Sequence, residues 1–287
     1  PAVCICLVYV LDRKTALRRE IRTAVRIEIG YLIFLFVTIP CGMVFSVSAD
    51  NIYSRGPHFY IYVIMYFGAI LYLSISTIIT AREFQNRSRM LIYPLILFVM
   101  VETIIQVALP ELHVTWLCVT LLSVLYFIYC NEMWNQLDAL TGLLNQNSYL
   151  KQTQKIKYNS GVLVVFDVDD FKQVNDCHGH MKGDLCLAGI AECIKKAYAD
   201  FGYCYRIGGD EFCVLLKNRA KEEECKQEFL RRWTEKRRKF TFFPTVSYGS
   251  APVSGEDIAV VKDRADRDMY QYKKGRKKHC SSGVLSK

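Results

Sequence analysis

The chain changes its pattern of apolar and polar residues once, near residue 130. Before that point apolar residues run in long stretches with little charge, and four stretches approach the roughly 20 residues that a transmembrane helix needs. They cover residues 30–49, 59–79, 90–109 and 113–130, and residues 1–11 resemble the remainder of a fifth. Helices of a water-soluble domain would keep a polar face, which these stretches lack. The pattern therefore predicts an α-helical transmembrane bundle over residues 1–130, truncated at its N-terminus because the chain starts inside an apolar run.

Basic residues gather in alternate loops of this region, and short loops rich in Lys and Arg mark the cytoplasmic side of a membrane. The two basic segments carry Arg13, Lys14, Arg18, Arg19, Arg22 and Arg26, and then Arg82, Arg87 and Arg89. The loop between them carries only Arg55. We therefore expect the last helix to leave the membrane into the cytoplasm near Asn131. Glu102 lies inside the third stretch, where an ionisable side chain marks a functional site or a protonated partner of a neighbouring helix.

After residue 130, short β-branched runs alternate with segments of helical periodicity. The predicted strands cover residues 161–168, 203–207, 212–216 and 240–251, and the predicted helices include residues 183–198, 222–239 and 257–274. Their order, β-α-α-β-β-α-β-α, predicts an α+β sandwich with helices packed on a largely antiparallel sheet. We divide the chain into a membrane region (1–130), a short connector (131–137), a catalytic domain (138–280) and a tail (281–287).

The strand predicted at residues 161–168 ends in a group of acidic residues. Alternate residues of a strand point to the same side, so Asp167 and Asp169 are expected to face the same place. Considered alone, Asp169 and Asp170 are also typical caps for the helix that follows.

A second acidic group, Asp210-Glu211, follows Gly208-Gly209 between two predicted strands. Two glycines in this position indicate a hairpin, because glycine enters positive φ freely. Considered alone, the four residues are an ordinary turn. If the strands are neighbours, however, the carboxylates converge beside exposed backbone N–H groups, which suits Mg²⁺ and a polyphosphate.

Composition adds two exclusions. The net charge of +9 comes from 37 Lys and Arg against 28 Asp and Glu, and no basic patch is interleaved with aromatic residues. We therefore expect a mildly basic, solvated surface and no nucleic-acid partner. The 12 cysteines form no CxxC pair, which indicates reduced thiols and no zinc site.

Four blocks of the polar half resemble the GGDEF family of diguanylate cyclases. The signature is Arg206-Ile207-Gly208-Gly209-Asp210-Glu211-Phe212, and residues 138–145 (DALTGLLN) resemble the opening block of the family. Residues 167–184 (DVDDFKQVNDCHGHMKGD) match the family's longest block, and residues 245–249 (TVSYG) with Ala265, Asp266, Tyr270 and Lys273 resemble the later ones. The resemblance covers about residues 135–278 and implies a GGDEF domain of the nucleotide-cyclase or palm-like fold.

The resemblance also implies roles for individual residues. The metal, Mg²⁺ with Mn²⁺ as an alternative, would be held by Asp167, the backbone carbonyl of Val168 and Asp210. The catalytic residues would be Asp210 or Glu211, which help to deprotonate the 3′-hydroxyl, and Lys172, which stabilises charge on the phosphates. Substrate binding would fall to Asn175 and Asp184 (guanine), Phe171 and His180 (beside the nucleotide), Gly208 and Gly209 (α-phosphate), and Lys273 with Arg276 or Lys277 (triphosphate).

The sequence departs from the family pattern in three places. The family's Lys-x-x-Gly-Arg is one residue shorter here, Lys273-Lys274-Gly275-Arg276, which leaves the triphosphate contact open between Arg276 and Lys277. The inhibitory product site RxxD is missing, since its two positions are Ala199 and Gly202. Gln146 replaces the usual Arg after the opening block, with no consequence that we can infer.

The resemblance implies a diguanylate cyclase that converts two GTP into cyclic di-GMP and two pyrophosphates. Each 3′-hydroxyl would attack the other nucleotide's α-phosphate across a homodimer, formed through the catalytic and transmembrane halves. We expect a multi-pass protein of the inner membrane with a cytoplasmic catalytic domain. The alternative is a catalytically silent GGDEF receptor or GTP-binding regulatory module.

Overall fold

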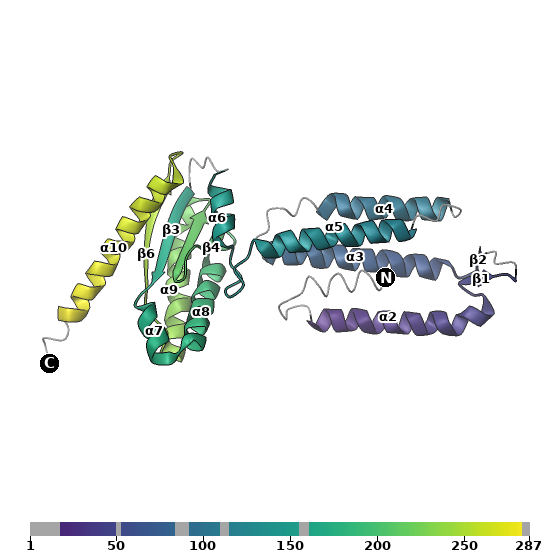
Figure 1. The fold of residues 1–287 in the computed structure, drawn as a ribbon, viewed down its shortest axis with the longest axis horizontal. Helices are drawn as coiled ribbons and strands as arrows, with labels where there is room; N and C mark the ends of the chain where they lie inside the picture. The colour runs from purple at the N-terminus through teal and green to yellow at the C-terminus, as the bar shows by residue number, and fades with distance from the viewer. Residues whose placement is uncertain (1–17, 50–52, 84–91, 110–114, 155–160, 283–287) are drawn as a thin grey trace. The chain divides into compact units, whose positions relative to one another are not determined.

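The fold is seen in a computed structural model that describes residues 18–49, 53–83, 92–109, 115–154 and 161–282. The chain divides into two compact units, Pro1–Trp134 and Asn135–Lys287 (Figure 1).

The first unit is built from long apolar helices. They are α2 (Arg18–Thr38), α3 (Tyr60–Glu83), α4 (Ile92–Ala108) and α5 (Thr115–Asn135), with a 3-10 turn η1 (Ile39–Cys41) and a small hairpin of β1 (Phe45–Val47) and β2 (Tyr53–Arg55). A cluster of Ile70, Val99 and Leu122 joins α3, α4 and α5. Three segments in the described part are long and apolar enough to cross a membrane: Ile21–Cys41, Tyr60–Ile79 and Leu117–Asn135.

The predicted first span, residues 30–49, is wrong in both its limits. The helix begins at Arg18, so that Arg22 and Arg26 lie on a helix and not in a loop. It ends at Thr38 because Pro40 follows and Gly42 takes a positive φ of 61°, a conformation that stops a helix. The apolar residues after Gly42 pair with β2 instead of continuing the helix.

The other predicted spans overlap α3, α4 and α5. The described part of α4 has 17 residues and carries the buried Glu102, whose Oε2 accepts a hydrogen bond of 3.3 Å from the Tyr66 hydroxyl. Helix α5 extends into the expected connector, residues 131–137, and ends at Asn135. Residues 1–11 and the predicted loop arginines Arg87 and Arg89 lie outside the described residues.

The second unit contains a four-stranded sheet in the order β4-β5-β3-β6, in which every neighbouring pair is antiparallel. Its strands are β3 (Gly161–Val168), β4 (Gly202–Arg206), β5 (Glu211–Leu216) and β6 (Val246–Val253). Its helices are α6 (Gln146–Thr153), α7 (Phe171–His178), α8 (His180–Tyr198), α9 (Glu222–Lys239) and α10 (Ile258–Ser282), with a 3-10 turn η3 (Arg219–Lys221). From β3 onward the order of helices and strands agrees with the predicted β-α-α-β-β-α-β-α.

Helices cover both faces of this sheet (Figure 1). Along β3, Val162, Val164 and Phe166 pack against α8 and α9, whereas Leu163 and Val165 pack on the side of α6 and α10. The alternation follows from the two-residue period of a strand. Because both sides of β3 are buried, its sequence reads as a continuous apolar run that ends where the acids begin. The predicted α+β architecture of this half is confirmed at this level.

Two local expectations differ from the structure. The strand predicted at residues 240–251 begins only at Val246, because Phe243 turns into the core beside α8 and Pro244 lacks the N–H that a ladder needs. The Trp233 indole holds this segment by donating to the Pro244 carbonyl at 3.2 Å. Helix α6 was not predicted, although its cap is local: Asn145 accepts a hydrogen bond of 3.0 Å from the Ser148 N–H.

Candidate active site

The glycine turn joins β4 to β5 next to the end of β3. Its ends close through the Ile207 N–H, which donates to the Glu211 carbonyl at 3.0 Å, and the Val168 N–H donates to the Asp210 carbonyl at 3.2 Å. Glu211 lies opposite Asp167 in the antiparallel register of β5 and β3. The expectation that strand neighbourhood brings the two acidic groups together is therefore confirmed.

The reason expected for the two glycines is wrong, because neither has a positive φ. At Gly208 the constraint is space: a Cβ there would lie 3.2 Å from the Cβ and Oε2 of Glu211. At Gly209 the surroundings are open. The missing side chains leave the backbone of the turn accessible, which is what a close approach by a phosphate requires.

Arg206 fixes the tip of this turn, and the sequence reasoning gave it no role. Its Nε and Nη2 donate to the Gly209 carbonyl at 3.2 and 2.7 Å, and its Nη1 donates to Asp138 Oδ1 at 3.0 Å. The same oxygen of Asp138 accepts from the N–H and the hydroxyl of Thr141. Burial alone would raise the pKa of Asp138, but these hydrogen bonds and the Arg206 charge lower it below its usual value.

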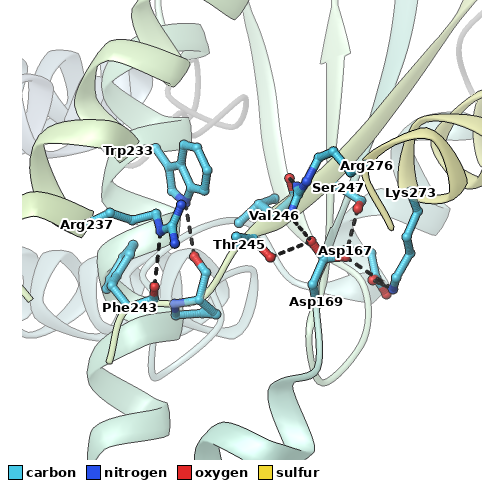
Figure 2. Close-up of polar contacts among 11 residues, drawn as sticks. Asp167, Asp169, Trp233, Arg237, Phe243, Thr245, Val246, Ser247, Lys273 and Arg276 are labelled. Carbon is cyan, nitrogen blue, oxygen red and sulfur yellow. Dashed lines mark hydrogen bonds and ion pairs between the residues drawn. The ribbon is translucent and has the colours of Figure 1, made fainter. Parts of the chain in front are cut away.

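Asp167 and Asp169 face the same place, as expected, and α10 supplies cations to both (Figure 2). Lys273 Nζ lies 2.5 Å from Asp167 Oδ1 and 3.3 Å from Asp169 Oδ1. Arg276 Nη2 lies 3.1 Å from Asp169 Oδ2. Burial would lower the pKa of Lys273, but the hydrogen bond and the charges of the two carboxylates raise it above its usual value.

Asp169 is buried and does not cap α7, so one of the two roles that the sequence left open for it, that of a helix cap, is wrong. Its carboxylate accepts from the hydroxyls of Thr245 at 2.8 Å and Ser247 at 2.7 Å, which face the same side of the chain entering β6 (Figure 2). Asp170 occupies the cap position but makes no side-chain capping bond, and its φ of 52° is the one positive φ of a non-glycine residue in the described part of the chain. The two-residue spacing of Thr245 and Ser247 is the signal that could have indicated their shared partner.

The expected guanine side of the site lies where α7 and α8 meet. A Cβ at Gly183 would lie 1.9 Å from Asn175 Oδ1 and 3.3 Å from the Phe171 ring, so the missing side chain lets α7 approach this closely. Asp184 follows Gly183 in the first turns of α8, and His180 begins that helix. Both side chains are exposed, so the roles expected for them, Asp184 at the guanine and His180 beside the nucleotide, stay predictions.

The remaining predicted residues surround this centre. Lys172 lies exposed in the first turn of α7, and Glu211 is exposed at the start of β5. Arg276, one of the two candidates for the shortened motif, donates to the Val246 carbonyl at 3.0 Å. Lys277 lies in α10, but its side chain is outside the described part.

The oxygen ligands predicted for a metal fit a hard divalent cation. Asp167 precedes Val168 at the end of β3, and the Asp210 backbone is bonded to Val168 through the hydrogen bond from the Val168 N–H. Carboxylate and carbonyl oxygens of such residues are the donors that Mg²⁺ prefers. The Lys273 ammonium on Asp167 shows that this position accepts a positive charge. Among the described residues no group of three His, Cys, Asp or Glu side chains gathers as a metal site, so further ligands would come from water or phosphate.

Comparisons with known proteins agree with this arrangement. A family model described as "Diguanylate cyclase, GGDEF domain" matches residues 135–279, half of the chain. Diguanylate cyclase DgcZ of Escherichia coli (strain K12) is 30% identical over 165 residues, covering 54% of this chain and 56% of that protein. Diguanylate cyclase DgcS of Shewanella oneidensis is 31% identical over 150 residues, covering 50% of this chain and 51% of that protein. The chain thus spans about half the length of these relatives.

Among solved structures, the GGDEF domain of DgcB from Caulobacter crescentus in complex with c-di-GMP is similar over 49% of this chain and 91% of that one, with 27% identity and a TM-score of 0.43. The family match itself begins at the first residue of the second unit and includes the glycine turn, the acidic residues and the cations of α10. The chain therefore belongs to the diguanylate cyclase family that is defined by the GGDEF domain.

Proposed function

We propose that this protein is a diguanylate cyclase that condenses two GTP molecules into cyclic di-GMP with release of two pyrophosphates. The observation that carries the proposal is the charge pattern at one end of the sheet. Asp167 lies opposite Glu211 beside the glycine turn. From α10, Lys273 pairs with Asp167, and Arg276 pairs with the nearby Asp169. Acidic side chains that can hold a metal ion lie here beside a glycine turn with an exposed backbone and beside two basic side chains. This combination suits a triphosphate with a bound metal ion.

Each residue group has one task in the proposed reaction. Asn175 and Asp184 bind the guanine, and Asp184 can accept from N1–H and the exocyclic amine, which adenine does not offer together. Gly208 and Gly209 let the α-phosphate approach the turn, and Lys273 with Arg276 or Lys277 holds the outer phosphates. Phe171 and His180 flank the nucleotide. These contacts orient the substrate, which supplies much of the rate enhancement in such reactions.

The bond-making step needs little more than alignment and charge neutralisation. Asp210 or Glu211 accepts the proton of the 3′-hydroxyl, and the oxygen attacks the α-phosphorus of the second GTP as pyrophosphate leaves. Lys172 stabilises the negative charge that develops on the phosphates. Mg²⁺, or Mn²⁺ in its place, held by Asp167, the Val168 carbonyl and Asp210, would supply Lewis-acid stabilisation of the same charge.

One domain holds one GTP, so the reaction needs two domains face to face. We propose a homodimer that pairs through the GGDEF domains and through the apolar helices of the first unit. In this proposal α2 to α5 lie in the inner membrane and the GGDEF domain lies in the cytoplasm. The apolar segments in α2, α3 and α5 support the membrane setting.

The test is the product. Membranes that contain the full chain are incubated with GTP and Mg²⁺, and the nucleotides are identified by mass. Cyclic di-GMP and pyrophosphate in a 1:2 ratio support the proposal. Binding of GTP without any product, in protein shown to be folded, would overturn it in favour of a silent GTP-binding module.

A further inference from the structure

Lys273 makes an unusual set of contacts for a residue that is expected to bind phosphate. Its ammonium is seated on the carboxylate of Asp167, a proposed metal ligand, at 2.5 Å. Asp169 Oδ1 also lies near this ammonium, at 3.3 Å. The cation therefore sits where a metal ion would compete with it, and a second carboxylate is within reach (Figure 2).

The second carboxylate is held more firmly than the first. The exposed fraction of Asp169 is 6%, and its two oxygens accept from Ser247 and Thr245 at 2.7 and 2.8 Å. Its backbone N–H also donates to the Thr245 carbonyl at 2.9 Å. Asp169 is thus bound to the chain that enters β6, and its position does not depend on Lys273.

The helix that carries Lys273 is fixed one turn further on. Arg276 donates to the Val246 carbonyl at 3.0 Å and pairs with Asp169 Oδ2 at 3.1 Å. Movement of the Lys273 ammonium from Asp167 to Asp169 therefore requires only rotation of its own side chain, while α10 stays docked on β6.

We propose that Lys273 is a tethered counter-ion that occupies Asp167 when no nucleotide is bound, and that it couples metal binding to triphosphate binding. A metal ion alone must displace the ammonium from Asp167. A metal ion that arrives with a triphosphate brings the anion that draws Lys273 away, and Asp169 keeps the ammonium at the site. Asp169 is then a positioning residue for Lys273. This inference rests on the proposed function, since it takes Asp167 as a metal ligand.

The coupling has a defined sign. Two cations that share one carboxylate repel each other, so the free protein binds a divalent ion weakly while Lys273 is seated. Linkage requires that the nucleotide strengthens metal binding by the same factor by which the metal strengthens nucleotide binding. Removal of the ammonium should raise the affinity for the metal alone and reduce this mutual strengthening.

The test measures Mn²⁺ binding to the full chain in detergent by electron paramagnetic resonance, without nucleotide and without turnover. We expect Lys273→Met to bind Mn²⁺ about tenfold more tightly than the parent, the effect of losing one nearby like charge at a half-buried site. The matched control is Lys274→Met, which removes the same charge from the same helix. Lys274 stacks on Tyr270 at 4.4 Å and should leave Mn²⁺ affinity unchanged. Lys273→Gln, a shorter neutral donor, replaces Lys273→Met if the latter does not fold.

A second measurement adds an α,β-methylene analogue of GTP, which cannot be turned over. In the parent and in Lys274→Met the analogue should raise Mn²⁺ affinity strongly, and in Lys273→Met it should raise it several-fold less. The free analogue also binds Mn²⁺ in solution, but this contribution is the same in the measurements on all three proteins and does not affect their comparison.

The outcomes separate this inference from the proposed function. If the parent makes cyclic di-GMP but Lys273→Met and Lys274→Met bind Mn²⁺ alike, the counter-ion role is overturned and the cyclase remains. If no variant binds Mn²⁺ with or without the analogue, the metal site itself is overturned, and the counter-ion with it.

Discussion

The two units of this protein differ in where their large apolar side chains lie. In the first unit large apolar side chains point outward: Phe36 is 79% exposed, Leu117 71% and Leu97 64%. In the second unit the sheet is covered on both faces, and the apolar residues of β3 and β5 are buried. A surface like that of the first unit is stable only where lipid or another chain replaces water, which accords with the proposed membrane setting.

The polar residues differ in the same way. The first unit holds single polar groups between helices, such as Glu102 beside Tyr66 and Thr77 beside the Tyr126 hydroxyl at 2.9 Å. The second unit brings acids of β3 and β5 together at one end of the sheet, where cations of α10 pair with Asp167 and Asp169. This difference supports the proposal that the second unit carries the chemistry and that the first serves for location and pairing.

The largest effect is expected inside the second unit. Asp210→Ala removes a proposed metal ligand from a turn that contributes little to the core, so product formation should fall by at least about 100-fold while the protein stays folded. The matched control is Asp170→Asn, a neighbouring acid at positive φ, where Asn is well tolerated. Product by mass and thermal unfolding are measured on both. Turnover by Asp210→Ala within tenfold of the parent would contradict its role.

Removal of the first unit should have the next largest effect. A fragment covering residues 131–287 should bind GTP but turn it over slowly, because two tethered domains meet at about millimolar effective concentration and free domains do not. Specific activity at nanomolar enzyme should rise with enzyme concentration, and a parallel leucine zipper in place of the first unit should restore the rate. A high activity that does not change with dilution would show that the second unit dimerises unaided.

Choice of base should depend on one exposed carboxylate of the second unit. Asp184→Ser replaces the acceptor for guanine N1–H by a weaker, neutral one, and such a mismatch costs about 1–3 kcal/mol. The preference for GTP over ATP should therefore fall by roughly 5- to 150-fold, measured as the ratio of kcat/KM values. If the variant discriminates as sharply as the parent, another residue reads the base.

Added product is expected to have no effect on the initial rate. The positions of the missing RxxD site are Ala199 and Gly202, so micromolar cyclic di-GMP should leave the initial rate unchanged. At Gly202 the space is also closed, since a Cβ would lie 2.6 Å from the Leu215 carbonyl. Initial rates are titrated with added product at several GTP concentrations. Inhibition that excess GTP does not relieve would reveal a regulatory site elsewhere, for example in the first unit.

Local pattern determined much of this protein. The strand over residues 161–168 and the helix over residues 222–239 have the limits that their periodicity predicts, because a buried strand and a charged helix differ in every short window of sequence. The glycine turn and the two acids that follow it were predicted from adjacent residues, and Asp167 and Asp169 share a side because a strand alternates.

Tertiary structure decided what depends on residues far apart in the chain. Asp169 contacts Thr245 and Ser247, which are 76 and 78 residues away in the chain, and Asp167 contacts Lys273, which is 106 residues away. No local period encodes such contacts. Short-range propensity determined the elements, and long-range packing and ion pairing decided which side chains form the site.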